Sequence, residues 1–281
     1  MNYSTKVLPS PAGTPERPDI TIVVPTYNER DRLRELASAL FSICADRGLR
    51  LELVIVDDNS PDGTGAIADE LARTLNVRVI HRSGKLGLAT AVVAGFAIAS
   101  ASIVGVMDAD FSHPPALVPR LFATCRSTGA DVVVASRYVP GGSTPNWPWK
   151  RRLLSRTACL LARPLSPIRD AASGFFLIRR EVARSVSIKA RGFKICLELL
   201  VRGWPRHIVE VPYRFDDREL GDSKMNMREA FGYLVQLRDL YWVRWNGPRR
   251  PPRHYERLTP GVVDRLTERQ CPVPSAAGHA D

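Results

Sequence analysis

The sequence predicts an α/β fold built on a mostly parallel sheet with helices on both faces. Short β-branched segments recur along the first half of the 281 residues, at 20–24, 51–56, 77–80, 103–106 and 132–134. Helical patterns lie between them, at about 30–44, 63–75, 87–100 and 114–127. Strands that alternate with helices of this length form parallel sheets, because each helix carries the chain back across the sheet. Such sheets bind ligands at the carboxyl ends of their strands.

The second half of the chain adds elements to the same sheet. The patterns predict a Gly/Pro loop at 140–148, a basic helix at about 150–163, a strand at 175–178, helices at 180–187 and 193–203, a strand at 207–212 and a helix at 227–245. Because no linker interrupts them, we expect one domain over residues 19–246. Proline and polar residues dominate both flanks, so we expect a disordered lead-in at 1–18 and a disordered Pro/Arg-rich tail at 247–281.

Basic side chains are concentrated in the second half. Residues 1–136 carry 13 basic and 15 acidic side chains, a net charge of −2, whereas residues 137–281 carry 27 and 14, a net charge of +13. With 44% hydrophobic residues the chain can bury a large core, which excludes a disordered or collagen-like protein. Charge alone leaves nucleic acid, anionic lipid and a phosphate-rich small substrate open as partners.

Cysteine usage and the apolar segments are typical of a cytosolic protein. The five cysteines are scattered and form no Cys-x-x-Cys pair, which predicts reduced core thiols. The N-terminus lacks the apolar core of a signal peptide. The uncharged segment 86–107 is long enough to cross a bilayer, but it is rich in Ala and contains three Gly and two Ser. We therefore interpret it as a helix, a turn and a strand.

Carboxylates follow directly after three of the predicted strands. The three segments are Pro25-Thr-Tyr-Asn-Glu29, Asp57-Asp-Asn-Ser-Pro-Asp62 and Asp108-Ala-Asp110. All lie at the edge of the sheet where a ligand would bind. Asp62 fits a helix N-cap equally well. Asp108 and Asp110 would repel each other without a cation or a proton between them, so this pair predicts a metal site.

Six motifs follow one another in order over residues 19–226. They are Pro25-Thr-Tyr-Asn-Glu29, Val56-Asp-Asp-Asn-Ser-Pro-Asp-Gly-Thr64, Gly84-Lys-Leu-Gly-Leu88, Asp108-Ala-Asp-Phe-Ser-His-Pro114, Ser136-Arg-Tyr138 and Arg218-Glu-Leu-Gly-Asp-Ser-Lys224. With these motifs the sequence resembles the family 2 glycosyltransferases of the Rossmann-like GT-A fold, in particular the dolichol- or polyprenol-phosphate mannose synthases. The resemblance implies inverting, metal-dependent transfer of a sugar, with GDP-mannose favoured as donor, to a polyprenyl phosphate.

The resemblance implies that the first half of the chain holds the donor. Contacts to the nucleotide sugar would come from Pro25, Tyr27, Glu29, Val56, Asp58, Asp108 and Ala109. Lys85 either meets a phosphate or lies in a turn. Asp110 would be the principal ligand of Mg²⁺ or Mn²⁺, with Asp108 and Ser112 beside it. Ser112 stands where some relatives have Gln.

The second half would hold the acceptor. A phosphate monoester is already ionised at neutral pH, so the reaction needs cations more than a general base. The resemblance implies catalytic roles for Arg137, Arg218 and Lys224 together with Asp110, and the three cations would also contact the donor. The acceptor phosphate would be bound by Ser136, Arg151 and Arg152.

Three further polar residues have more than one interpretation. We interpret His113 as a residue that fixes the loop and not as a base. Asp170 either orients an arginine or the sugar, or caps a local turn. Glu198 lies in an apolar helix and would be costly to bury alone, so we expect an arginine partner.

Aromatic residues beside cations predict contact with a membrane. Asn146-Trp-Pro-Trp149 leads into the basic helix, and the helix at 227–245 carries Phe231, Trp242 and Trp245. Such residues suit the lipid headgroup layer, so we expect interfacial C-terminal helices and a peripheral protein on the cytoplasmic leaflet. Ordinary core packing of these aromatics is the alternative. Many relatives carry transmembrane helices after this domain, which leaves an integral-membrane partner subunit open.

Several rival functions remain at the level of sequence. The same transfer from UDP-glucose or another nucleotide sugar is open, because sugar choice rests on few contacts. Polysaccharide synthesis is disfavoured, since Arg244-Trp245 lacks the Gln of a Gln-x-x-Arg-Trp motif. A non-catalytic basic adaptor for membrane or nucleic acid is disfavoured by the intact Asp108-Ala-Asp110, and we expect no nucleic-acid partner.

Overall fold

Apolar segments of the first half form the predicted strands, and amphipathic segments form the helices between them. The computed structural model describes residues 6–8, 17–186, 194–216 and 227–273. In the first half β2 (Ile20–Thr26), α1 (Arg30–Ala45), β3 (Leu51–Asp57), α2 (Thr64–Thr74), β4 (Val77–His81), α3 (Leu88–Ile98), β5 (Ile103–Val106), α4 (Leu117–Thr128) and β6 (Val132–Ser136) follow in order. The uncharged segment 86–107 thus forms a helix and a strand, as predicted.

The second half begins with the basic helix. The elements here are α5 (Trp149–Ala162), β7 (Phe176–Arg179), α6 (Arg180–Arg184), α7 (Ile195–Arg202), β8 (His207–Pro212), α8 (Met227–Asn246), β9 (His254–Arg257) and α9 (Pro260–Gln270). Within the described residues no helix is both long and apolar enough to cross a membrane.

Together with β1 (Lys6–Leu8), the strands of the described residues form one mixed sheet in the order β1-β4-β3-β2-β5-β7-β6-β8-β9. β2, β3, β4 and β5 run parallel, and so do β6, β8 and β9. β7 lies between β5 and β6 and is antiparallel to both. Since β7 is antiparallel to both β5 and β6, β6 runs in the same direction as β5, and so does β8. The parallel strands on both sides of β7 therefore end at the same edge of the sheet.

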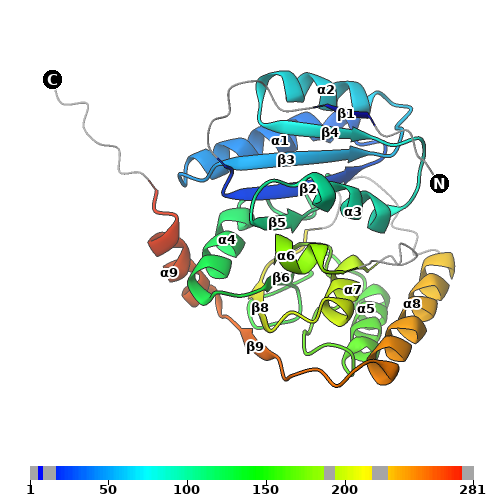
Figure 1. Ribbon diagram of the computed structural model, residues 1–281. Coiled ribbons are helices and arrows are strands. Elements are labelled where there is room, and N and C mark those ends of the chain that lie inside the picture. Colours follow the sequence, from blue (N-terminus) through cyan, green and yellow to red (C-terminus); the bar gives the residue numbers. More distant parts are fainter. Residues whose placement is uncertain (1–5, 9–16, 187–193, 217–226, 274–281) are drawn as a thin grey trace.

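Helices cover both faces of the sheet (Figure 1). Side chains alternate along each strand, so Ile22 and Val24 of β2 face one apolar cluster while Val23 faces the other. The first cluster includes residues of α1, α2, α4 and α9, and the second includes residues of α3, α5, α6, α7 and α8. Strands that are buried on both faces explain the nearly continuous apolar segments of the sequence.

The tail predicted to be disordered contains ordered structure. β9 extends the sheet by pairing in parallel with β8, and α9 packs on α4. Val263 and Thr267 are buried four residues apart on one face of α9, and Cys271, directly after the helix, is also buried. Such a small set of buried residues is easily overlooked within a Pro- and Arg-rich segment. The prediction of disorder is therefore wrong for residues 254–270.

Three smaller expectations can also be compared with the structure. The lead-in contains β1 (Lys6–Leu8), which pairs antiparallel with β4, so disorder is wrong there for these residues. Glu198 is buried and has the predicted arginine partner, Arg202, with 2.9 Å between Nε and Oε1. All five cysteines are buried free thiols, as predicted.

Candidate active site

The loops that carry the motifs leave the sheet at one edge. Thr26 at the end of β2 is in register with Asp57 at the end of β3, and Val23 with Val106 at the end of β5. Ser136 ends β6 opposite Pro212 of β8. The parallel register therefore brings the segments after β2, β3, β5 and β6 together, as the sequence predicts.

Left-handed backbone conformations mark three of these loops. Asn28, Asn59 and Phe111 have φ values of 60°, 58° and 63°, and they follow β2, β3 and β5 respectively. Asn tolerates this conformation, but a bulky residue such as Phe adopts it at a cost of about 1–2 kcal/mol. Strain of this kind persists where the surrounding structure enforces it and is concentrated at functional sites.

The loop after β3 is tied to the loop after β2 by hydrogen bonds. Asp62 accepts a hydrogen bond from the backbone N–H of Thr64 at 2.9 Å at the start of α2, and another from that of Arg30 at 3.2 Å. The backbone N–H of Glu29 donates to the Thr64 hydroxyl at 2.9 Å. Asp62 is not the predicted N-cap, because Gly63 occupies that position of α2; it joins the first N–H groups of α1 and α2, while the Thr64 hydroxyl holds Glu29.

Asp58 is buried against an arginine that the motifs do not include. Its Oδ1 lies 2.7 Å from Nε of Arg82, and its Oδ2 accepts a hydrogen bond from the backbone N–H of Leu86 at 3.2 Å. Arg82 also donates to Thr90 at 2.8 Å. Asp58 thus anchors the loop that carries Lys85, and Arg82 at the end of β4 gives no signal in the sequence beyond its position after a strand.

Lys85 and Tyr27, two residues predicted to bind the nucleotide sugar, are in contact with each other. The Nζ of Lys85 lies 4.0 Å from the centroid of the Tyr27 ring, a cation–π contact. Tyr27 is exposed, with 37% of its surface accessible. An exposed aromatic face beside an ammonium group is suited to a nucleotide, which offers a base to stack on and phosphates to pair with.

The carboxylates after β5 differ in exposure. The side chain of Asp108 is 40% exposed, whereas Asp110 is buried. Oδ1 of Asp110 accepts a hydrogen bond from the backbone N–H of Ser112 at 3.0 Å, and Arg32 of α1 holds the Asp110 carbonyl at 2.8 Å. Carboxylate and hydroxyl oxygens are the ligands that Mg²⁺ and Mn²⁺ prefer, so the side chains of Asp108, Asp110 and Ser112 fit such an ion by their chemistry.

His113 fixes the conformation of this loop. It is buried and stacks on Phe175 with 5.0 Å between the ring centroids, and its Nδ1 accepts a hydrogen bond from the backbone N–H of Asp108 at 3.0 Å. Burial lowers the pKa of the His113 imidazole below its usual value. A neutral ring whose Nδ1 is occupied carries its proton on Nε2, 3.9 Å from the Asp108 carboxylate.

Arg137, directly after β6, and Asp170 form a buried ion pair. Nε and Nη2 of Arg137 each donate to Asp170 at 2.7 Å, and the backbone N–H of Arg137 donates to it at 2.9 Å. Burial opposes the charge of Arg137, but the ion pair with Asp170 raises its pKa above the usual value. Asp170 therefore orients an arginine, one of the roles predicted for it.

A second arginine reaches the same aromatic cluster. The guanidinium carbon of Arg151 lies 4.0 Å from the centroid of a Trp147 ring, and that of Arg137 lies 5.1 Å from it. Trp147 is buried and in edge contact with Phe215. Two guanidinium groups thus contact the same indole, and guanidinium groups are suited to binding a phosphate. Trp147 and Phe215 were not predicted as site residues.

Gly174 joins the two halves of the site. A Cβ atom at this position would lie 3.4 Å from Cε1 of His113 and 3.8 Å from Oδ2 of Asp108. The segment that begins with Asp170 therefore passes directly beside the Asp108 carboxylate. The missing side chain leaves room next to Asp108 for a ligand.

Several residues predicted to bind the substrates have side chains that are buried or bonded to other parts of the protein. The side chain of Ser136 is fully buried and its hydroxyl bonds to Glu210, so the expected contact with an acceptor phosphate is not met. Arg152 is exposed and donates to the Pro145 carbonyl at 2.8 Å, which anchors the loop before α5. Val56 and Ala109 are buried, so their side chains are closed to a nucleotide. The catalytic candidates Arg218 and Lys224 lie outside the described residues.

Comparisons with known proteins agree with this architecture. Residues 21–187 match the model of glycosyl transferase family 2. The chain is 41% identical over 81% of its length to a dolichol-phosphate mannosyltransferase of Pyrococcus furiosus, of which it spans 64%. It is also 41% identical over 74% of its length to a polyprenol monophosphomannose synthase of Mycolicibacterium smegmatis, covering 83% of that protein.

A solved structure shows the same fold at low sequence identity. A mannosyltransferase of Pyrobaculum calidifontis in complex with GDP-mannose and Mn²⁺ superposes with a TM-score of 0.56 at 19% identity, covering 96% of this chain and 72% of that one. The predicted GT-A architecture is thereby confirmed. Since the family model covers most of the domain and the relatives match along most of the chain, this protein belongs to glycosyl transferase family 2 and is a glycosyltransferase.

Proposed function

We propose that the chain transfers a mannosyl group from GDP-mannose to a polyprenyl phosphate. The observation that carries this proposal is that one short segment, which begins with Asp170, the buried partner of Arg137, also brings Gly174 beside the Asp108 carboxylate. Carboxylates for a metal-bound diphosphate and cations for a second phosphate are what such a transfer requires. The relatives from Pyrococcus furiosus and Mycolicibacterium smegmatis, named for dolichol and polyprenol acceptors, support the substrate class.

On the donor side, Tyr27 and Lys85 would hold the nucleotide while Asp108 and Asp110 would hold Mg²⁺ or Mn²⁺. When bound, this ion supplies positive charge to the leaving diphosphate. The hydrogen bond from Ser112 and the contact of Arg32 fix the loop that carries Asp110 before any ligand arrives. Such preorganisation lowers the cost of reaching the transition state, because the protein groups need not reorient.

On the acceptor side, Arg137 and Arg151 would bind the phosphate monoester. Its second pKa is about 6, so the attacking oxygen is already charged at neutral pH and needs no base. Neutral His113 is held by the loop and does not act as that base. The cations would aim the phosphate oxygen at the anomeric carbon from the side opposite the diphosphate, so we propose a single displacement with inversion.

A transfer assay tests the substrate assignment. Purified protein is incubated with a short-chain polyprenyl phosphate and either labelled GDP-mannose or labelled UDP-glucose, with Mg²⁺, Mn²⁺ or a chelator. We expect lipid-linked product from GDP-mannose with either metal, less from UDP-glucose, and none with the chelator. Transfer from UDP-glucose alone would replace the proposed donor, and undiminished transfer in the chelator would refute the metal role.

We also propose that the protein lies on the cytoplasmic surface of a membrane. Helix α5 exposes Trp149, Leu153 and Leu160 at 68%, 58% and 69% of their surface, and α8 exposes Trp242 and Trp245 at 69% and 74%. Tyr241 of α8 donates to the Leu161 carbonyl of α5 at 2.6 Å, so the two helices are neighbours. Large exposed apolar patches mark interaction sites, and tryptophans prefer the headgroup layer.

The double substitution Trp242→Ser/Trp245→Ser should weaken vesicle binding. Both substitutions remove an indole that would bury apolar surface in the lipid headgroup layer. We therefore expect the vesicle partition coefficient of the protein to fall about tenfold or more. Cosedimentation with anionic vesicles measures the change, and Val93→Ser, at an exposed apolar residue of α3, is the control. Equal binding of the wild type and the double variant would contradict a role of α8 at the membrane.

A further inference from the structure

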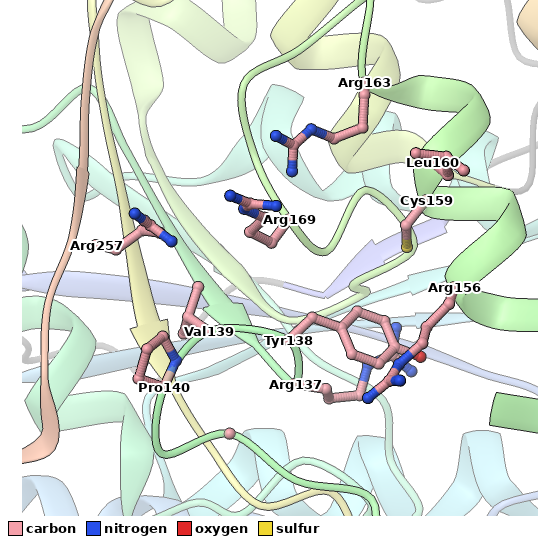
Figure 2. A pocket seen from close by; sticks show the side chains of 11 residues that line it. Arg137, Tyr138, Val139, Pro140, Arg156, Cys159, Leu160, Arg163, Arg169 and Arg257 are labelled. Atoms are coloured by element: carbon pink, nitrogen blue, oxygen red, sulfur yellow. The ribbon is translucent and has the colours of Figure 1, made fainter. Parts of the chain in front are cut away.

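An arginine-lined pocket lies on the α5 side of the sheet, near the end of β9. It has a volume of about 540 Å³, and five arginines line it: Arg137, Arg156, Arg163, Arg169 and Arg257. Among the described residues that line it there is no Asp or Glu. Figure 2 shows Arg163, Arg169 and Arg257 extending toward one open space from the end of α5, the loop that follows it and the end of β9.

Four of these arginines are available to a ligand. Arg137 is committed to Asp170, but within the described part of the chain Arg156, Arg163, Arg169 and Arg257 form no ion pair with a carboxylate. Among the described residues, Arg156 makes an aromatic contact, with its guanidinium carbon 5.8 Å from the Tyr138 ring centroid. Like charges gathered around one space repel each other, and a bound anion relieves that repulsion.

The pocket is separate from the site described above. Asp108, Asp110 and Arg151 are absent from its lining, and Arg137, which it shares with that site, directs both Nε and Nη2 at Asp170. Tyr138 lines the pocket, lies with its ring centroid 5.5 Å from the guanidinium carbon of Arg137, and donates a hydrogen bond to Ser155 of α5 at 2.7 Å. A ligand in the pocket would therefore lie among four arginines that are not assigned to the candidate active site.

The rim of the pocket is apolar and exposed. Leu160 lines the pocket and exposes 69% of its surface, and Leu161 beside it exposes 45%. These residues continue the apolar face of α5 that carries Trp149 and Leu153. An anion that enters here therefore has cations around its charge and leucines beside its entrance.

We propose that this pocket binds the phosphate headgroup of an anionic membrane phospholipid. Guanidinium groups match phosphate oxygens with paired hydrogen bonds, and a charged headgroup with acyl chains fits both the arginines and the exposed leucines. The proposal rests on the peripheral membrane position proposed above. Such a lipid fixes the orientation of α5, and with it Arg151, relative to the bilayer that presents the acceptor.

Vesicle binding of a charge-matched pair of variants tests the site. Arg163→Gln/Arg257→Gln removes two pocket cations, and Arg265→Gln/Arg269→Gln removes two exposed cations of α9, so both lose the same net charge. With vesicles of phosphatidylcholine and phosphatidylglycerol, we expect the pocket variant to bind about tenfold more weakly than wild type and the α9 variant within about twofold of it. Equal losses would show that only net charge matters and would overturn the site.

Competition with inorganic phosphate distinguishes a lipid headgroup from a soluble phosphate as the ligand of the pocket. Inorganic phosphate should compete only weakly for wild-type binding to these vesicles. The contrary result is that inorganic phosphate binds the wild type more tightly than the pocket variant while both proteins bind the vesicles equally well. In that case the ligand is a soluble phosphate and the lipid assignment fails.

A kinetic assay distinguishes the pocket from the acceptor site. The KM for a short-chain polyprenyl phosphate in detergent should be the same in the wild type and the pocket variant. A tenfold rise of this KM in the pocket variant would make the pocket the acceptor site instead. An inactive wild type would refute the proposed function and leave the vesicle result standing.

Discussion

Asp110→Asn should reduce sugar transfer by about 10³-fold or more, with most of the loss in kcat. The amide has nearly the shape of the carboxylate, and its oxygen can still accept the hydrogen bond from Ser112. It lacks the charge that a divalent ion requires beside a diphosphate, so the leaving group would develop its charge without compensation. Initial rates over a range of Mn²⁺ concentrations measure the effect.

The matched control is Asp46→Asn, at an exposed carboxylate after the end of α1. This variant should retain wild-type rates, and both variants should unfold at the wild-type temperature. Mn²⁺ bound in the presence of GDP, counted by electron paramagnetic resonance, should fall only in the Asp110 variant. Full activity of Asp110→Asn would refute the assignment of this residue as a metal ligand.

Asp170→Ala should lower the free energy of unfolding by about 3–5 kcal/mol, because it leaves the buried guanidinium of Arg137 without its counter-ion. Asp170 is fully buried and accepts three hydrogen bonds from Arg137, two from the side chain and one from the backbone. Urea denaturation followed by circular dichroism measures the change.

The double variant Arg137→Met/Asp170→Leu distinguishes the ion pair from simple loss of packing. Replacing both charges with apolar groups should recover much of the lost stability, since the cost of the single variant lies in the unpaired charge. The double variant should stay inactive, because the proposed phosphate ligand is gone. A single Asp170→Ala variant as stable as the wild type would show that Arg137 finds another partner or water.

The order of strands and helices could be predicted because local patterns determine it. Buried parallel strands produce continuous β-branched segments, and the position of a carboxylate after such a strand places it at the ligand edge without further information. Asp108 and Asp110 were identifiable on this ground alone. Likewise, the apolar surroundings of Glu198 were enough to predict an arginine partner.

Contacts between distant segments could not be predicted in the same way. Arg82 and Arg32 act through side chains that meet Asp58 and the Asp110 carbonyl only after the sheet has formed, and neither belongs to a motif. The burial of Ser136 depends on Glu210 in β8, which the sequence separates from it by a whole helical region. The tail was mispredicted because composition outweighed the few residues that are buried there, Val263, Thr267 and Cys271.

The direction of β7 has a practical consequence for engineering. Because this strand runs against its neighbours, the chain enters it at the edge where the parallel strands end, so Asp170 and Gly174 arrive at the site from the opposite direction to Asp108. An insertion ahead of β7 would displace the site itself. Tags or fused domains belong instead at the other edge, for example in the turn between α4 and β6, around Gly129.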